Sequence, residues 1–251
     1  MDDLALEVRA LDDVVVGDPE VADAGRGEVL QDRRAQSARA DDEHRGVEQR
    51  GLALGPDLVH ADADVGRPKV ESAREFVADR NPDVDVTTYE LRVDADTVTD
   101  LVADYDLVVD ASDNFPTRYL VNDACTLAGV PFAHGAILRF EGQVTTFEAR
   151  DGGPCYRCLF PEAPEPGTVP DCATAGVLGV LPGTVGCIQA TEAVKLVLDY
   201  GETLDGRMLF YDAADMSFET VAVEPRPDCP VCSPGDVESV HEVDYESTCS
   251  L

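Results

Sequence analysis

A short apolar run that ends in an acidic turn constrains the fold of this chain more than any other feature. The run Tyr105–Asp110 is typical of a strand buried in a parallel sheet. It stops at residues 111–114, a helix is predicted from about 116 to 128, and a second strand is predicted over 130–136. This β-α-β order predicts an α/β fold with a doubly wound, mostly parallel sheet. Ligands bind beyond the carboxyl ends of such strands, where Asp113 stands.

The rest of the chain from residue 59 onward has the same globular pattern. A helix is predicted to open at Gly66–Lys69 and to end at Asn81, because the residue before a proline avoids the α region. The last residues, 236–251, hold five acids and little apolar material, so we expect a mobile acidic tail. The other predicted elements are a strand over 84–88, a helix over 98–102, a strand over 143–148, an amphipathic helix over 184–200 (apolar at Val185, Ile188, Ala193 and Val197) and closing strands over 207–211 and 218–223.

The charge of the chain excludes some partners. Its 251 residues have a formal net charge of −32, which argues against nucleic acid or an anionic membrane as the main partner. No apolar run is long enough to span a membrane, and the start has no signal-peptide pattern, so a cytoplasmic protein is expected. Of the 19 basic side chains, only Lys69 and Lys195 are lysine. An acidic surface that is poor in lysine indicates adaptation to a high-salt cytosol.

Residues 1–58 differ in composition from the rest of the chain. All aromatic residues lie at Phe76 or later, and residues 1–58 contain no Ile, Thr, Asn, Lys or Cys. The simplest interpretation is a poorly ordered acidic extension.

Two Cys-x-x-Cys pairs predict a metal site. Each pair puts two thiolates within reach of one ion, and two pairs complete a tetrahedral shell of the kind that holds structural zinc. Two disulfides and a redox pair are the alternatives; the lack of a signal peptide weakens the first, and neither pair is predicted to start a helix after a strand. The proposed zinc ligands are Cys155, Cys158, Cys229 and Cys232.

The other four cysteines have separate interpretations. Cys172 lies in a loop rich in small residues, where a cysteine can be a nucleophile but is more often an unreactive thiol. Cys125 and Cys187 lie on apolar helix faces and are predicted to be in the core, and Cys249 is in the tail.

Residues 59–235 resemble the ThiF/MoeB/HesA adenylyltransferases, which are relatives of ubiquitin-activating enzymes. The resemblance covers about 70% of the chain in the order of the family, and implies its Rossmann-like fold. The matching runs are 64–73, 110–114, 136–143, 155–161, the loop around Cys172, 186–195 and 229–232. Together with the acidic, lysine-poor composition, this resemblance points to a haloarchaeal member of the family.

The resemblance implies an activity and roles for individual residues. Such enzymes bind ATP and Mg²⁺, adenylate the C-terminal glycine of a ubiquitin-like β-grasp carrier protein, and pass it to sulfur or a thiol. By resemblance, Asp113 is a magnesium ligand and a catalytic residue, and Asn114 lies beside it in the nucleotide site. Lys69 would hold phosphate at a helix start. Cys172 would be the catalytic thiol that takes the acyl group or exchanges it with a persulfide.

The resemblance also implies a homodimer and a separate sulfur donor protein, because no rhodanese-like region follows Cys232. Molybdenum cofactor, thiamine and tRNA thiolation pathways all fit, as does protein conjugation. Two other classes of function remain as alternatives. One is a zinc-stabilised module that binds a carrier protein without chemistry. The other is a nucleotide-dependent oxidoreductase, which the absence of a forward Gly-x-Gly-x-x-Gly motif disfavours.

The N-terminal unit of the family is absent or scrambled in this chain. The expected glycine loop, ribose-binding acid and Ser-Asn-Leu-x-Arg-Gln run are not found in residues 1–60. Read as the opposite DNA strand, codons permitted from His44 back to Ala24 encode a Gly-Ala-Gly-Gly-Leu-Gly loop. On the same opposite strand, codons permitted from Val16 back to Met1 encode an acidic residue followed by Ser-Asn-Leu-Gln-Arg-Gln. We hypothesise that residues 1–58 are the antisense translation of an inverted segment, with an unrelated extension as the alternative. In either case this chain is expected to be impaired in adenylation.

Overall fold

The structure is a computed structural model that describes residues 16–17, 59–149, 152–164, 176–233 and 237–245. The chain divides after Arg92 into two compact units, each of which is described by itself. The expectation that residues 1–58 form a poorly ordered extension concerns residues that lie almost entirely outside the described part of the chain.

Within its described residues, the first unit contains one long helix and a short strand pair. Strands β1 (Val16–Gly17) and β2 (Thr88–Tyr89) pair in parallel. A 3-10 turn, η1 (Asp62–Asp64), precedes helix α3 (Lys69–Arg80). The helix begins after Pro68 and its C-cap is Asn81, the residue before a proline, as the sequence predicts. The strand expected over 84–88 is found only at its last residue and Tyr89.

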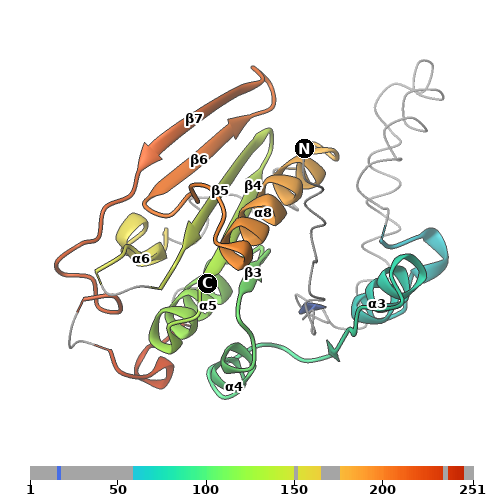
Figure 1. Ribbon diagram of the computed structural model, residues 1–251, viewed down its shortest axis with the longest axis horizontal. Coiled ribbons are helices and arrows are strands. Elements are labelled where there is room, and N and C mark those ends of the chain that lie inside the picture. The colour runs from blue at the N-terminus through green and yellow to red at the C-terminus, as the bar shows by residue number, and fades with distance from the viewer. Residues whose placement is uncertain (1–15, 18–58, 150–151, 165–175, 234–236, 246–251) are drawn as a thin grey trace, which may run out of the picture. The chain divides into compact units, whose positions relative to one another are not determined.

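The described residues of the second unit form a five-stranded sheet with helices packed on it (Figure 1). The strand order is β3-β4-β5-β6-β7. The strands are β3 (Val108–Asp110), β4 (Phe132–Leu138), β5 (Glu141–Phe147), β6 (Arg207–Asp212) and β7 (Ser217–Ala222). The helices are α4 (Val98–Ala103), α5 (Phe115–Ala128), α6 (Tyr156–Leu159) and α8 (Leu181–Leu198), and a 3-10 turn, η2 (Val240–Glu242), follows.

The α/β fold is confirmed, but this sheet is mixed rather than mostly parallel. Only β3 and β4, which α5 connects, pair in parallel. The pairs β4–β5, β5–β6 and β6–β7 are antiparallel. The reason is clearest where the connections are shortest, since two residues join β4 to β5 and a tight turn joins β6 to β7. A parallel pair needs a crossover of about a dozen residues or more, so these neighbours must be antiparallel.

Two hydrophobic clusters cover opposite faces of the sheet. Phe132 and Phe147 belong to a cluster with residues of α4 and α5. Ile137 and Val144 belong to a second cluster with Leu181 and other residues of α8. Side chains alternate along a strand, so the odd spacing between these positions on β4 and on β5 places the clusters on opposite faces. The sheet is therefore covered by α4 and α5 on one side and by α8 on the other (Figure 1).

Two glycines let α8 lie close to the sheet. A Cβ on Gly142 of β5 would clash with Cγ2 of Val185 on α8. A Cβ on Gly135 of β4 would lie 2.6 Å from Oε1 of Gln189, also on α8. The close approach lets Nε2 of Gln189 donate to the carbonyls of Asp110 (2.6 Å) and Ala133 (2.8 Å). This amide ties α8 to the carboxyl end of β3.

Three expectations about burial are wrong. Val109 of β3 is 52% exposed. β3 is an edge strand of the described sheet, and the face of the strand that carries Val109 is not fully covered there. On α8, Val197 is 44% exposed and Cys187 is also exposed. The buried side of α8 is defined by Leu181, Val185, Gln189 and Ala193, and Cys187 lies about 200° around the helix from Val185.

Part of the acidic tail is packed rather than mobile. Val240 in η2 is 2% exposed and belongs to the hydrophobic cluster of α4 and α5. Tyr245 packs against the same cluster, and its hydroxyl donates to Oδ2 of Asp123 on α5 (2.8 Å). The expectation of a mobile tail is therefore wrong for residues 237–245. No helix among the described residues has both the length and the apolar character needed to cross a membrane.

Candidate functional site

The four predicted zinc ligands lie together in the second unit. The Sγ atoms of Cys155, Cys158, Cys229 and Cys232 all lie within 4.8 Å of one another. Those of Cys155 and Cys229 are 3.5 Å apart, and those of Cys158 and Cys232 are 3.3 Å apart. A Zn–S bond of about 2.3 Å places tetrahedral sulfurs about 3.8 Å apart, so the arrangement fits a zinc ion.

The alternatives for these cysteines fit less well. None of the four is in a disulfide, and the two pairs converge on one point rather than standing apart. The first pair does include a helix start, which was not expected, because Cys155 is the N-cap of the one-turn helix α6. The backbone N–H of Arg226 also donates to Sγ of Cys158 (3.3 Å), a contact that stabilises a thiolate.

The turn between the first two cysteines is fixed to α5. The backbone N–H of Tyr156 donates to Oδ1 of Asn122 (2.7 Å). The guanidinium of Arg157 donates to both carboxylate oxygens of Asp123, at 2.8 and 2.6 Å. Asn122 and Asp123 are fully buried, so this is a desolvated and paired charge. Burial is the largest single effect and favours the neutral guanidine, but the hydrogen bonds and the negative charge of Asp123 together outweigh it and raise the pKa of Arg157.

The acidic turn at residues 111–114 lies at the carboxyl end of β3. Asp110, the last residue of the strand, is buried, and its Oδ2 shares a 2.7 Å hydrogen bond with Nδ1 of buried His134 on β4. Its Oδ1 accepts the backbone N–H of Ser112 (3.0 Å). Burial alone would raise the pKa of Asp110, but its hydrogen bond with His134 and the contacts of Ser112 outweigh burial and lower this pKa.

The rest of the turn is held from α5. Nε and Nη2 of Arg118 donate to the carbonyl of Ser112, at 3.3 and 3.1 Å. Oδ1 of Asn114 accepts the backbone N–H of Thr117 (2.9 Å), so Asn114 is the N-cap of α5. Its Nδ2 donates to Oδ1 of Asp113 (3.1 Å), and the Asp113 side chain is exposed. The turn therefore presents one exposed carboxylate from a rigid, partly buried base.

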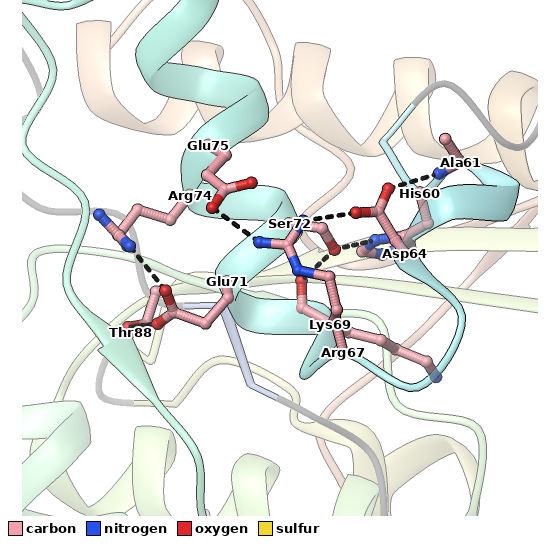
Figure 2. A network of polar contacts seen from close by, with 10 residues as sticks. All are labelled: His60, Ala61, Asp64, Arg67, Lys69, Glu71, Ser72, Arg74, Glu75 and Thr88. Atoms are coloured by element: carbon pink, nitrogen blue, oxygen red, sulfur yellow. Dashed lines mark hydrogen bonds and ion pairs between the residues drawn. The ribbon is translucent and has the colours of Figure 1, made fainter.

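Lys69 lies in the first unit, at the first residue of α3 (Figure 2). The neighbouring charges pair among themselves. Arg67 contacts Asp64 and Glu75 at 2.7 Å each, and Arg74 contacts Glu71 at 2.6 Å. No interaction is drawn from the exposed Lys69 side chain in Figure 2, and it has no acidic partner among the described residues.

The two lysines therefore differ. Nζ of Lys195 lies 2.5 Å from Oε1 of Glu192, a buried residue of α8. Lys69 is the lysine that is left without such a partner in the part of the chain that the structure describes. A lysine at a helix start is disfavoured by the helix dipole, whereas an anion bound there is favoured.

The remaining cysteines have different outcomes. Cys172 and Cys249 lie outside the described residues. Cys125 is completely buried on α5, as expected, and burial raises the pKa of its thiol. Cys187 is exposed, contrary to the expectation of a core position.

Sequence reasoning missed the residues that support these sites. His134, Gln189, Asp123 and Tyr245 are polar residues that come close to their partners only in the folded chain. One signal was present for His134, since a histidine within an otherwise apolar strand needs a buried partner. The structure thus brings together the four cysteines and, separately, Asp113 and Asn114, while Lys69 belongs to the other unit.

Comparison with known proteins identifies the family of this chain. Residues 54–231 match the ThiF family. The SAMP-activating enzyme E1 of Haloferax volcanii is 66% identical over 194 residues, which cover 77% of this chain and 71% of that protein. The sulfur carrier protein adenylyltransferase of Thermus thermophilus is 49% identical over 199 residues, 77% of this chain and 73% of that protein.

Among solved structures, the crystal structure of MccB from E. coli with ATP has a TM-score of 0.61. It is 19% identical in sequence, with 72% of this chain and 56% of that chain covered, so it supports the fold alone.

The chain belongs to the ThiF family. The family and the kind of enzyme expected from the motifs are confirmed, because the matched relatives are named as adenylyltransferases and activating enzymes. One of them comes from a haloarchaeon, in line with the acidic composition.

Proposed function

We propose that the encoded activity is the ATP-dependent adenylation of the C-terminal glycine of a ubiquitin-like carrier protein. The observation that carries this proposal is the exposed Asp113 carboxylate on a turn fixed by Asp110, Asn114 and Arg118. A family of adenylyltransferases requires ATP and Mg²⁺, and an oxygen ligand held on a rigid turn suits Mg²⁺. The carboxylate of the carrier would attack the α-phosphate and release pyrophosphate.

The chemistry of the individual side chains suggests a separate role for each residue. The two reactants are both anions, so bringing them together requires cations. Asp113 would hold Mg²⁺ against the phosphates, and Asn114 would fix the orientation of Asp113 through its Nδ2 contact. The ammonium of Lys69, which has no acidic partner among the described residues, would hold phosphate. The thiol of Cys172, which lies outside the described residues, would then accept the acyl group or exchange it with a persulfide as AMP leaves.

We further propose that Cys155, Cys158, Cys229 and Cys232 hold a structural zinc ion. The supporting observation is the convergence of four sulfur atoms without a disulfide. Zinc bound by four thiolates has no open position and would supply stability rather than chemistry.

The names of two matched relatives suggest the kind of partner that this chain has. A SAMP-activating enzyme and a sulfur carrier protein adenylyltransferase are named for small carrier proteins, so we propose such a carrier here. Sulfur transfer for molybdenum cofactor, thiamine or tRNA thiolation, and protein conjugation, are the candidate pathways. We also propose a separate sulfur donor protein, a homodimer, and a cytoplasmic, salt-adapted enzyme.

We propose that this exact chain is impaired in adenylation, because residues 1–58 lack a glycine loop that could bind the phosphates of ATP. The test is ATP–pyrophosphate exchange in concentrated KCl with a candidate carrier protein. It compares this chain with one in which residues 1–58 are replaced by the translation of their reverse complement. We expect exchange only from the replaced chain. Robust exchange by the unaltered chain would contradict the impairment.

The replaced chain also tests the roles of individual residues. D113N should abolish exchange, while D106N, a change at an exposed aspartate before β3, should leave it unchanged. If the replaced chain binds the carrier but catalyses no ATP–pyrophosphate exchange, the chain is a zinc-stabilised binding module instead. Sequencing one PCR product across the junction near His60 tests the inversion itself.

A further inference from the structure

The C-terminal segment 237–245 returns to the helix that supports the cysteine site. Two anchors hold it there. Val240 is buried in the cluster of α4 and α5, and the Tyr245 hydroxyl donates to Oδ2 of Asp123 (2.8 Å). Burial and the Asp123 carboxylate both raise the pKa of Tyr245, so its hydroxyl stays protonated as a donor.

Asp123 is shared between this segment and the first pair of cysteines. Its Oδ2 accepts from both Tyr245 and Nη2 of Arg157, at 2.8 and 2.6 Å. Its Oδ1 accepts from Nε of Arg157 and from Nδ2 of Asn122, each at 2.8 Å. Four hydrogen bonds thus satisfy one fully buried carboxylate. Such a network stabilises the fold most when it is complete, because a buried polar group that loses its hydrogen-bond partner destabilises the fold.

The same two stretches of chain are therefore joined twice. Through the sulfur atoms, the turn Cys155–Cys158 is joined to Cys232. Through Arg157 and Asp123, this turn is joined to Tyr245, which follows Cys232 in the chain. When one of these two connections has formed, the chain loses less conformational entropy in forming the other. Each connection therefore stabilises the other, and this coupling is reciprocal.

We infer that residues 237–245 form a strap that retains the metal of the four-cysteine site, with the Tyr245–Asp123–Arg157 network as its fastening. The inference rests on the proposal that these cysteines hold zinc. It assigns the acidic C-terminal segment a function in the metal site, although it contributes no ligand. Loss of a group that hydrogen-bonds directly to a metal ligand costs about 10–100-fold in metal affinity in other proteins, and Tyr245 acts further from the ligands, so we expect an effect at the low end of that range.

The test is the rate at which zinc passes from the folded chain to an excess of a chromogenic chelator, in concentrated KCl. Y245F removes one hydroxyl and leaves the ring and Val240 in place. We expect it to accelerate release about tenfold. Y200F is the matched control, because Tyr200 is 75% exposed and lies at the end of α8. It should release zinc at the unaltered rate.

A second variant tests the coupling. D123N should accelerate release at least as much, and adding Y245F to D123N should have little further effect, because both changes break one network. If D123N does not fold, Y245F alone decides the matter. Equal release by Y245F and the unaltered chain would overturn the strap. A reconstituted chain without zinc would instead overturn the metal proposal, and metal analysis before the kinetics separates these two results.

Discussion

The buried carboxylate of Asp110 lies 2.7 Å from Nδ1 of buried His134, directly across the parallel pair β3–β4. Asp110 also begins the turn that presents Asp113, through its contact with the Ser112 amide. Within the described residues, Nε2 of His134 is buried without a hydrogen-bond partner, so Asp110 is the polar contact that orients the imidazole. The pair ties the base of the turn to the centre of the sheet.

This pair predicts a specific acid sensitivity. The pKa of Asp110 is lowered in the folded chain, so its ionised form stabilises the fold above its unfolded pKa, near 4. That contribution is lost as the pH falls through the lower, folded pKa. D110N should therefore cost about 3 kcal/mol of unfolding free energy at pH 7. The difference from the unaltered chain should shrink with acidification below about pH 4.

Urea unfolding at a series of pH values measures this difference. D106N is the control, because Asp106 is exposed and lies on the same approach to β3. A cost for D110N that stays constant from pH 7 to pH 3 would show that the charge of Asp110 has no part in it.

The cysteine site predicts a selective loss of metal. C155S should lower bound zinc from one ion per chain to almost none, and should lower the unfolding free energy by several kcal/mol. C187S is the control, since Cys187 is exposed on α8 and away from the four ligands. Elemental analysis and thermal unfolding give both quantities. Full zinc retention in C155S would contradict the assignment of the ligands.

The contact between α8 and β5 predicts a steric effect. G142A should destabilise the fold by about 1–3 kcal/mol, because its Cβ would clash with Val185. G183A changes a glycine within α8 that has nothing within 4 Å of the new Cβ, and should be neutral or stabilising by up to about 1 kcal/mol. Chemical unfolding of the two variants separates the effect of the steric clash from the general effect of replacing a glycine by alanine.

The net charge of −32 predicts a dependence on salt. Charges repel over about 10 Å at 0.1 M salt but over only about 3 Å at 1 M. Circular dichroism should therefore show loss of structure when KCl is lowered to about 0.1 M. NaCl should substitute for KCl, whereas sucrose, which does not screen charge, should be less effective. Full structure at the low salt concentration would exclude the high-salt adaptation.

The sequence predicts the parts of this fold that depend on local signals. Pro68 and Asn81 mark the ends of α3, and the Cys-x-x-Cys spacing predicts a four-cysteine cluster before any coordinates are known. Asp113 follows a strand end, as the apolar run before it indicates. Each of these is encoded within a few residues of the chain.

What the sequence does not predict depends on distant partners. Cys187 is exposed because α8 buries a different face, which only the packing against β4 and β5 determines. The packing of Tyr245 could not be anticipated, because its partner Asp123 lies far away in the chain. A polar, acidic segment looks mobile when its few apolar residues, such as Val240, have no visible partner.

The contrast between the two lysines has a practical consequence for covalent labelling. Lys195 is held by Glu192, whereas Lys69 is exposed at the start of α3. Amine-reactive reagents used in limited amounts should thus modify Lys69 before Lys195. Once the more reactive α-amino group of the chain is blocked, a fluorophore or cross-linker attached in this way would report on the proposed phosphate-binding position, without any engineered cysteine.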